Sequence, residues 1–520
     1  MNDGGYDHII VGGGSSGAAL AARLSEDPAR SILLLEAGPD FRSHEAPWAM
    51  RIANPGPIIL GDPRYQWPSL KAWRTEVQRP IPYWRGRGVG GSSSINGQIA
   101  IRPPLDDFDR WSAAGCAGWS AAEVLPAFIR LEDDEAYGDR PYHGRGGPIP
   151  IYRAPRTSWG AVDRAVADAA LALGYGWADD HNAPGATGVS PYAINSRGGV
   201  RVSTNDAYLE AARGRPNLTI RGDALVDRIE FTGTRARGVR VRIDEHWRHI
   251  AGREIILSAG AIHSPTILMR SGIGPARDLA ALGIAVRVDA PAGDNLLDHP
   301  QMSLSLALKP EARAAGLGSR HTNCCVRYSS GVAGTGANDM IFIAYNLLGA
   351  KPEALAHGHI WAAVYQSFSR GTVRITSADP RIDPEVRFRM LSDARDLIRM
   401  RDAARRLIEI GAQPAIRAIA DAVGLGRTIA DNDPRPGASA IPTDDWIMAN
   451  CFDVQHAAGT CRMGAASDPR AVVDPACHVI GVEGLRVIDA SIMPEIVRAN
   501  THLTAVMIGE LMATRIRAGG

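Results

Sequence analysis

The sequence lacks the features that would direct it to a membrane or to nucleic acid. It contains no run of about 18 or more apolar residues, so we expect no transmembrane helix. Its 57 Lys and Arg nearly balance its 56 Asp and Glu, which leaves no net field to attract nucleic acid or an anionic membrane. A strand pattern begins within a few residues of Met1, which leaves no room for a signal peptide and predicts a cytoplasmic protein.

Cysteine is sparse, and its spacing suits neither a metal site nor a disulfide framework. None of the six cysteines belongs to a CxxC pair, and the adjacent Cys324 and Cys325 fit neither zinc nor an ordinary disulfide. We therefore expect reduced cysteines in the core and no metal site. No internal repeat is visible either.

What the chain does have is size and an ordinary globular composition. Its 520 residues are too many for one hydrophobic core, and a content of 45% hydrophobic and 22% charged residues is typical of a soluble globular protein. Two or more domains are therefore expected.

The first forty residues carry the strongest motif. The apolar run from Ile9 to Val11 predicts a buried strand, and it leads into Gly12, Gly14, Gly17 and then small residues that favour a helix packed on the strand. Gly12 permits a tight turn, Gly14 lets backbone amides approach a pyrophosphate, and Gly17 allows close packing of helix on strand. The pattern predicts a dinucleotide site.

Glu36 restricts which dinucleotide this motif can bind. It follows a second apolar strand at 32–35, about 20 residues after Gly17, where a carboxylate accepts hydrogen bonds from an adenosine ribose. A 2′-phosphate would be repelled there, so an NADP-type ligand is excluded. The motif by itself leaves FAD and NAD open.

Later stretches predict a second domain inserted into the first. Residues 41–85, rich in Pro and Trp, predict an ordered loop that covers a site, and residues 86–103 are rich in glycine but too apolar for a flexible linker. Between about 300 and 450, alternating strands and a long amphipathic helix predict an antiparallel sheet with helices on one side. Helices are also expected at 109–131, 159–173 and 207–213, and strands at 218–221, 226–232, 236–241, 253–260 and 484–491.

Four stretches together resemble the glucose-methanol-choline (GMC) family of FAD-dependent alcohol oxidoreductases. They are the fingerprint up to Glu36, residues 86–109, residues 260–274, and the C-terminal segments that hold His456 and Asn500. The resemblance covers essentially the whole chain. Residues 137–151 and 318–332 look most like the branch of the family that oxidises furanic and aryl alcohols.

The resemblance implies an α/β fold with two domains. One is a discontinuous, Rossmann-like FAD-binding domain formed by residues 1–155, 195–300 and 450–520. The other is an α+β substrate-binding domain with an antiparallel sheet, formed by residues 156–194 and 301–449.

The resemblance also implies FAD and assigns residues to it. The flavin should be held without a covalent bond, because Ile95 stands where some members carry the histidine that is linked to it. Val226 would meet the adenine through its backbone, and Trp67 would lie near the flavin end of the covering loop. The residues assigned to cofactor binding are Gly12, Gly14, Ser15, Ser16, Gly17, Glu36, Ala37, Trp67, Arg87, Gly91, Asn96, Gly97, Gln98, Ile99, Val226, Ala259, Asp489, Ala490 and Thr501.

The expected chemistry needs a base beside the substrate hydroxyl. Its proton must be removed as hydride leaves the same carbon for flavin N5, and histidine has a suitable pKa. The resemblance places His456 in this role, with Asn500 holding the substrate oxygen where some members have a second histidine. Small residues after His456 leave room for a flat ring system.

Asn500 also precedes a helix pattern, where an asparagine is an ordinary N-cap. The N-terminus of that helix presents amides and about half a positive charge, which would favour the negative N1 and O2 region of reduced flavin. His502 departs from the asparagine common in relatives. Its backbone is expected near the flavin pyrimidine and its ring turned away from proton transfer.

We expect Val364, Tyr365, Gln366 and Gln455 to line the substrate pocket, with core packing as the alternative for Val364. The expected activity is oxidation of small primary aromatic or furanic alcohols to aldehydes, with oxygen reduced to hydrogen peroxide. The expected partners are the alcohol and molecular oxygen, and no oligomeric state is indicated. One alternative is a dehydrogenase that uses a quinone or dye acceptor, and another is an FAD-containing lyase of the hydroxynitrile type.

Overall fold

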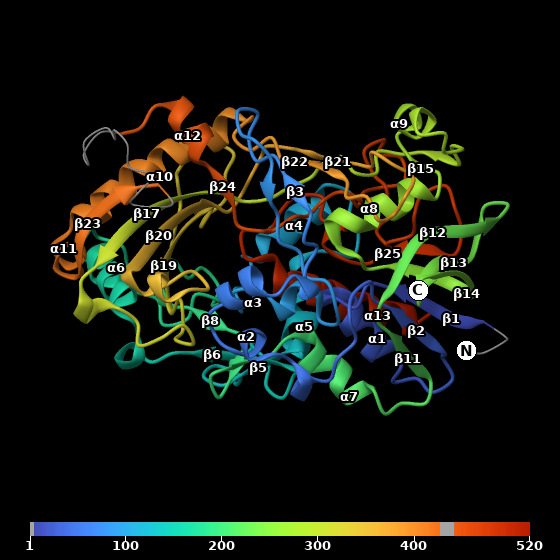
Figure 1. The fold of residues 1–520 in the computed structure, drawn as a ribbon, viewed down its shortest axis with the longest axis horizontal. Coiled ribbons are helices and arrows are strands. Elements are labelled where there is room, and N and C mark those ends of the chain that lie inside the picture. Colours follow the sequence, from blue (N-terminus) through green and yellow to red (C-terminus); the bar gives the residue numbers. More distant parts are fainter. Residues whose placement is uncertain (1–4, 427–440, 520) are drawn as a thin grey trace.

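The structure, a computed structural model, describes residues 5–426 and 441–519. Its two largest sheets lie toward opposite ends of the longest axis of the molecule (Figure 1). The first sheet has the order β11-β2-β1-β14-β13-β12, with β25 also paired to β14. Its strands are β1 (Tyr6–Val11), β2 (Ile32–Leu35), β11 (Leu218–Arg221), β12 (Ala224–Thr232), β13 (Arg235–Ile243), β14 (His246–Leu257) and β25 (Leu485–Val487).

The first sheet is parallel on one side and antiparallel on the other. β11, β2, β1, β14 and β25 run parallel, whereas β12, β13 and β14 form successive hairpins. Residues 32–35 and 255–257 are buried, and both segments are continuous apolar runs, as is usual for parallel strands covered on both faces. The sheet draws strands from three separate segments of the chain, and both described ends of the chain lie on its side of the molecule (Figure 1).

Helix α1 (Ser15–Leu24) connects β1 to β2 and packs against the C-terminal helix α13 (Thr501–Arg517). A Cβ on Gly509 of α13 would lie 2.5 Å from the carbonyl oxygen of Ser16, so only glycine permits this approach. The Ser16 hydroxyl donates to the carbonyl of Ala505 at 2.6 Å. The last helix is thereby fixed beside the first.

The second sheet is antiparallel and has the order β23-β17-β20-β19-β18-β7, with β24 also paired to β17. Helices α6 (Ala161–Ala172) and α10 (Ala394–Ala412) pack on one face. Its strands are β7 (Gly188–Pro191), β17 (Pro300–Leu308), β18 (Cys324–Tyr328), β19 (Met340–Tyr345), β20 (His357–Val364), β23 (Ala420–Leu425) and β24 (Phe452–Asp453).

Alternation along these strands separates two apolar surfaces. Leu304 and Val364 belong to the core formed with α6 and α10. Ile341, Ala363 and Tyr365 belong instead to the core shared with the first sheet. One face of the second sheet is therefore covered by its own helices, and the other faces the first domain.

Two predicted helices differ from the structure, and one observed strand was not predicted. The helix expected over 109–131 is two helices, α4 (Asp106–Ala113) and α5 (Ala121–Leu131), because Gly115 and Gly118 between them have φ of 98° and 86°. Strand β18 was not predicted. The segment expected as a helix at 207–213 is a π-helical turn over Asn205–Leu209 that continues into a short helix, α7 (Glu210–Ala212).

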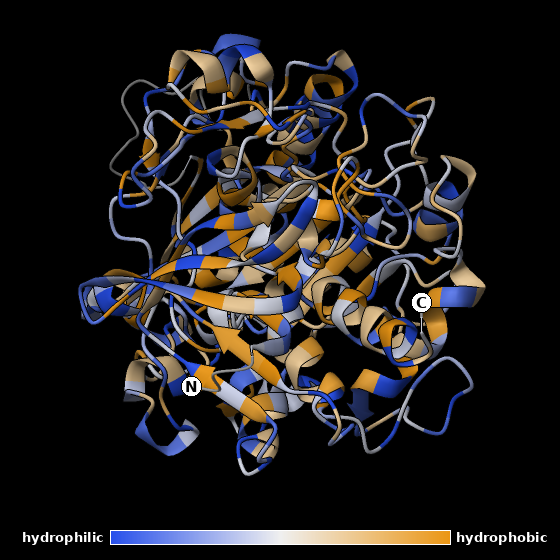
Figure 2. Cartoon of the chain, turned by 90° about the vertical axis from the view of Figure 1, so that its right-hand side faces the viewer, coloured by the Kyte–Doolittle hydropathy of each residue, from blue (hydrophilic) through white to orange (hydrophobic). Residues whose placement is uncertain are grey.

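Apolar colour is concentrated on the strands inside the molecule, and the peripheral loops are mostly blue or white (Figure 2). Within residues 5–426 and 441–519, no helix is long and apolar enough to cross a membrane. All six cysteines are unpaired and buried, as expected.

Candidate active site

A cavity of about 860 Å³ lies between the two sheets. Val11 and Leu35 at the ends of β1 and β2 line one part of it, and Ser303 and Trp361 of the second sheet line another. A volume of this size suits a bound organic ligand, and the carboxyl ends of parallel strands are the usual place for one.

The three fingerprint glycines have different surroundings. A Cβ on Gly12, whose φ is 105°, would lie 2.4 Å from the carbonyl oxygen of Ser258, and a Cβ on Gly17 would lie 1.9 Å from that of Gly12. Gly14 lines the cavity, and the nearest atom to a Cβ there would be the Cα of Gly91 at 3.8 Å. Gly12 and Gly17 therefore permit the packing, while Gly14 leaves its side of the cavity open.

Glu36 lines the cavity and joins three backbone segments. Its carboxylate accepts hydrogen bonds from the amides of Gly13, Gly38 and Gly88, at 2.9, 3.0 and 2.8 Å. Burial raises the pKa of Glu36, while these three amides oppose the shift. The sequence predicted a ribose ligand for this carboxylate, and the structure adds that the same group ties the glycine-rich stretch to the first strands.

Most residues expected to bind the cofactor lie around this one cavity. Its lining includes Gly12, Gly14, Ser15, Ser16, Glu36, Ala37, Trp67, Gly91, Asn96, Gly97, Ile99, Val226, Ala259, Asp489, Ala490 and Thr501. Gly17, Arg87 and Gln98 are outside the lining. The guanidinium of Arg87 lies 5.7 Å from the ring of Trp67, and the side-chain amide of Gln98 donates to the carbonyls of Ile52 and Ala53.

His456 and Asn500, which are distant in the sequence, meet at the cavity. His456 follows β24 and Asn500 immediately precedes α13, so the two residues are positioned by different elements. The amide nitrogen of Asn500 lies 3.1 Å from Nε2 of His456. Both side chains line the cavity, which fulfils the geometric condition for the predicted pair.

A chain of hydrogen bonds assigns the tautomer of His456. Nε2 of His299 lies 3.0 Å from the carbonyl oxygen of Val497 and must donate to it, which leaves Nδ1 of His299 as an acceptor. Nδ1 of His456 lies 2.8 Å from that nitrogen and must donate to it. Nε2 of His456 is therefore unprotonated and directed at Asn500. Burial, followed by His299 and Arg85, holds the pKa of His456 well below its usual range, so the imidazole is neutral.

Two tyrosines orient the amide of Asn500. The hydroxyls of Tyr365 and Tyr192 donate to its carbonyl oxygen at 3.1 and 3.3 Å. The oxygen is thus directed to the tyrosines and the NH2 group to His456. Without these two donors the amide could turn over, which would present an acceptor to the lone pair of His456.

Asp298 fixes the backbone beneath the pair. Its carboxylate accepts from the backbone amides of His456 at 2.9 Å and His299 at 2.7 Å, and from the hydroxyl of Tyr83 at 2.7 Å. The Tyr83 oxygen in turn accepts from the amide of Ala457 at 3.0 Å. Burial raises the pKa of Asp298 to about 7.

The sequence analysis did not assign roles to His299, Asp298, Tyr83 or Tyr192. The first two belong to the stretch 293–299, and the adjacent Asp-His pair that follows Leu296 and Leu297 was the available signal. No comparable signal marked the two tyrosines, because each comes from a different segment and is brought to the site only by the fold.

The expected pocket residues are only partly brought together. Gln455 lines the cavity, and its side-chain amide donates to Asp453 at 2.6 Å. Val364 and Gln366 are not among the lining residues, because strand alternation turns Val364 into the core with α6 and α10. The carbonyl of the Gln366 side chain accepts from the amide of Gly336 at 2.7 Å. Tyr365 between them reaches the site through its hydroxyl.

His502 lines the cavity in the first turn of α13. Its Nδ1 lies 3.1 Å from the hydroxyl of Ser15, away from the pair formed by His456 and Asn500. Burial, with a smaller contribution from Arg201, lowers the pKa of His502 to about 4. The ring is therefore neutral and is directed to the fingerprint helix, in line with the expectation that it does not transfer the substrate proton.

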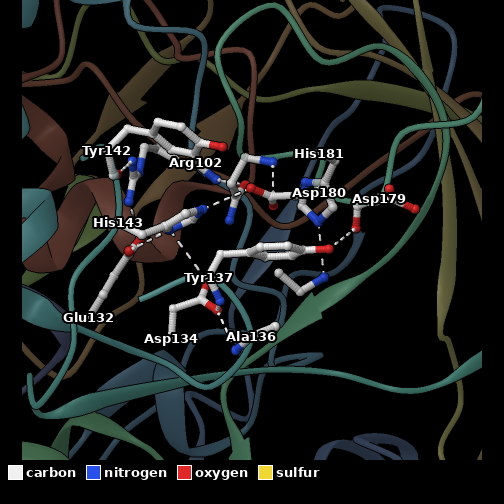
Figure 3. Close-up of polar contacts among 12 residues, drawn as sticks. Arg102, Glu132, Asp134, Ala136, Tyr137, Tyr142, His143, Asp179, Asp180 and His181 are labelled. Carbon is white, nitrogen blue, oxygen red and sulfur yellow. Dashed lines mark hydrogen bonds and ion pairs between the residues drawn. The ribbon is translucent and has the colours of Figure 1, made fainter. Parts of the chain in front are cut away.

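A second buried polar cluster surrounds Arg102, near the end of the glycine-rich stretch 86–103 (Figure 3). Its members are Arg102, Glu132, Asp134, His143, Arg153 and Asp180. Burial lowers the pKa of His143, but Asp180 and Glu132, which accept hydrogen bonds from its two ring nitrogens, raise it above its usual value. Three carboxylates thus face two arginines and the ring of His143, and Arg102 is fixed at the end of the segment that begins at Asn96.

Comparison with known proteins assigns the chain to a family. Residues 6–301 match the N-terminal family model of the GMC oxidoreductases, and residues 367–509 match the C-terminal one. The chain belongs to the GMC oxidoreductase family. This GMC oxidoreductase is 38% identical to a 5-(hydroxymethyl)furfural oxidase of Methylovorus sp. (strain MP688), over 99% of both chains. It is 37% identical to an oxygen-dependent choline dehydrogenase of Chromohalobacter salexigens, over 98% of this chain and 95% of the other.

Solved structures share the fold. The crystal structure of pyridoxine 4-oxidase from Mesorbium loti superimposes with a TM-score of 0.87 at 31% identity, over 99% of both chains. A fungal aryl-alcohol oxidase at 22% identity has a TM-score of 0.82 over both whole chains and shows the fold alone. The expected architecture, a Rossmann-like domain with an α+β domain, is confirmed.

The cofactor of this GMC oxidoreductase is FAD, and the cavity fits it. The missing side chain of Gly14 leaves room beside the N-terminus of α1, Glu36 borders the cavity at the end of β2, and the N-terminus of α13 lines the cavity next to that of α1. Ile95 also lines the cavity and carries no group that could bond covalently to a flavin.

Proposed function

We propose that this chain is an oxidase of small, neutral primary alcohols with an aromatic or furanic ring, which transfers their electrons to oxygen and releases hydrogen peroxide. The observation that carries the proposal is the unprotonated Nε2 of the neutral His456, held 3.1 Å from the amide of Asn500. A hydroxyl placed between these two groups meets one acceptor and one donor.

In this proposal His456 removes the hydroxyl proton. Its Nε2 accepts that proton, while the NH2 group of Asn500 donates to the substrate oxygen and holds the carbinol carbon in place. The positive charge that forms on His456 is shared with His299, whose ring accepts from Nδ1 of His456 at 2.8 Å. FAD supplies the acceptor for the hydride that leaves the same carbon.

Aromatic side chains on the substrate side of the cavity support the choice of ring-bearing alcohols. Trp361, Tyr345 and Phe452 line it, with ring centroids 4.4 Å apart for Tyr345 and Trp361 and 5.2 Å apart for Trp361 and Phe452. Such a wall buries a flat apolar ring and favours edge or offset contacts with it. The relative that acts on 5-(hydroxymethyl)furfural, at 38% identity, supports the same class.

The charges of the lining favour a neutral alcohol over choline. The acidic residues that line the cavity in the described part of the chain are Glu36, Asp453 and Asp489. Glu36 accepts from three backbone amides, Asp489 accepts from Ser264 and Gly260, and Asp453 is paired with Arg74. No free carboxylate therefore remains to compensate a quaternary ammonium group.

The electron acceptor and the reaction class are decided by one set of assays. The purified holoenzyme is supplied with 5-(hydroxymethyl)furfural, benzyl alcohol or choline in air, and peroxide is measured against reduction of a quinone or dye under nitrogen. We expect aldehyde and peroxide in equal amounts from the two ring-bearing alcohols and little from choline. Dye reduction without peroxide would indicate a dehydrogenase. Cyanide release from a cyanohydrin, with no flavin reduction by any alcohol, would indicate a lyase.

A further inference from the structure

Arg201 is a buried cation whose hydrogen bonds all go to neutral groups. It ends β10 (Val200–Arg201) and is 4% exposed. Its guanidinium donates to the carbonyls of Met50 at 2.8 Å and Ser93 at 3.2 Å, and to the side-chain oxygen of Asn96 at 2.9 Å. Its remaining nitrogen, Nη2, has no partner.

Some buried arginines of this protein have carboxylate partners, whereas Arg201, like Arg327, donates only to neutral groups. Arg74 faces Asp453 and Arg399 faces Asp339 and Asp396, with side chains no more than 2% exposed. For Arg201, no carboxylate lies within 4 Å in the part of the chain that the structure describes. Since burial of an unpaired charge is costly, a negative charge brought close to Arg201 would be stabilised by it.

Arg201 lies directly behind the wall of the cofactor cavity. Asn96, which accepts its hydrogen bond, lines the cavity, and so does His502 in the first turn of α13. The charge of Arg201 contributes, after burial, to the lowered pKa of His502, so its field reaches the N-terminus of this helix. Asn96 and the first turn of α13 are thus two parts of one wall, with a fixed positive charge behind them.

The charge persists at neutral pH. Burial lowers the pKa of Arg201 to about 9, Asp206 opposes the shift, and Arg320 adds to it. Arg320 itself donates to the hydroxyl of Ser196 and leaves its Nη1 unpartnered. Two cations without carboxylate partners therefore lie on the same side of the cavity, and the field they produce there is positive.

We propose that Arg201, positioned behind Asn96, is a fixed charge that stabilises the negative charge FAD acquires on reduction and so raises its reduction potential. Arg201 does not touch the substrate and acts through Asn96 and through its field. The electrons come from the donor and the counter-charge from this guanidinium, which is in place before any electron arrives. The inference rests on FAD binding and not on the identity of the alcohol.

The test is the midpoint potential of the holoenzyme, with no alcohol present, together with the affinity of its flavin for sulfite, which forms an anionic adduct. For Arg201→Gln we expect the equilibrium constant for two-electron reduction to fall about tenfold, a shift of about 30 mV to more negative potential. Sulfite should bind about tenfold more weakly. Arg201→Lys keeps the charge and should retain most of both properties.

Asp206→Asn provides a second variant, for which we expect a shift of the reduction potential in the opposite direction. Asp206 partly offsets Arg201, and its carboxylate bonds to Ser203 and Ser43 on the side away from the cavity lining. Its removal should raise the potential and tighten sulfite binding. If Arg201→Gln retains no FAD, Asp206→Asn decides the question.

An unchanged potential in Arg201→Gln, or equal shifts in the Gln and Lys variants, would overturn the proposal, because charge would then not be the cause. So would an unchanged or lowered potential in Asp206→Asn. Neither measurement uses an alcohol. If the protein shows the expected shifts but oxidises no alcohol, the proposed function is wrong and the role of Arg201 still holds.

Discussion

At the scale of single residues, the direction of the hydrogen bonds around His456 decides what it can do. The carbonyl of Val497 fixes the proton of His299, His299 fixes the proton of His456, and the lone pair of His456 is left facing the cavity. Tyr365 and Tyr192 fix the amide of Asn500 in the same way. Each group in this chain has one orientation that satisfies all its neighbours.

Removing one of the tyrosine hydroxyls should weaken this arrangement. Tyr365→Phe deletes a donor to Asn500 worth about 0.5 to 1.5 kcal/mol, so we expect flavin reduction by benzyl alcohol to slow roughly 3- to 10-fold. Tyr328→Phe is the matched control, because Tyr328 is buried in the same domain and its hydroxyl has no partner. Equal rates for the two variants would show that Tyr365 does not orient the amide.

Asp298 should make stability depend on pH. Burial raises its pKa from 3.8 to about 7, and Asp453 adds to the shift while Tyr83 and Arg85 oppose it. The folded state then binds this proton more tightly than the unfolded chain. Stability from this group is complete below about pH 4 and is lost as pH rises through 7.

The comparison uses Asp298→Asn, which keeps an acceptor for the two backbone amides and cannot ionise. We expect the free energy of unfolding of the variant, relative to the natural protein, to rise between pH 4 and pH 7 and to level off above. Urea unfolding at a series of pH values measures this difference. A difference that is constant with pH would exclude a raised pKa for Asp298.

The sequence predicted the pair that we propose acts on the alcohol and missed most of the residues that orient this pair. His456 and Asn500 follow from chemistry and family resemblance. The partners come from segments far apart in the chain, such as Tyr83 before the glycine-rich stretch and Tyr192 at the edge of the second sheet, and only folding brings them together. Val364 was wrongly expected to line the cavity. A shift of one residue along a strand turns the side chain to the other face of the sheet, and Val364 lies on the face that packs against α6 and α10.

At the scale of elements, the turn between β1 and α1 depends on the absence of side chains. Gly17→Ala would place a methyl group 1.9 Å from the carbonyl oxygen of Gly12, so either the helix or the turn must move. Overpacking of this kind costs about 1–3 kcal/mol and displaces the amides that face the cavity. We expect a lower melting temperature and less than half of the normal FAD content.

Gly214→Ala is the control for this substitution, because a Cβ at Gly214 would meet no atom within 4 Å. Absorbance at 280 and 450 nm gives the FAD content of both proteins. Full FAD occupancy in Gly17→Ala would mean that close packing of α1 on β1 is not required for the site.

Element prediction succeeded where periodicity was strong. Strands β2, β11, β12 and β13 were expected within about two residues of their observed bounds, whereas β14 begins at His246, well before the expected residue 253. Predictions failed where a few residues overrode the pattern, as Gly115 and Gly118 do between α4 and α5. Strand β18 escaped because it contains Arg327, a charged residue that is nevertheless buried.

At the scale of the whole molecule, the cavity that fits FAD is lined by residues of both large sheets, and we expect the cofactor to be held there by packing alone. Because Ile95 offers no nucleophile, we expect unfolding in detergent or acid to release all the flavin from the chain. Flavin fluorescence in a denaturing gel checks this. A fluorescent band that migrates with the polypeptide would show a covalent link at another residue.

The proposed function depends on one imidazole, that of His456, which would take a proton from an alcohol beside FAD. The most direct measurement mixes holoenzyme and benzyl alcohol without oxygen and follows the 450 nm absorbance, in the natural protein and in His456→Ala. We predict rapid bleaching in the natural protein, recovery when air is admitted, and bleaching at least about 100-fold slower in the variant. Bleaching at an undiminished rate in His456→Ala would contradict the account.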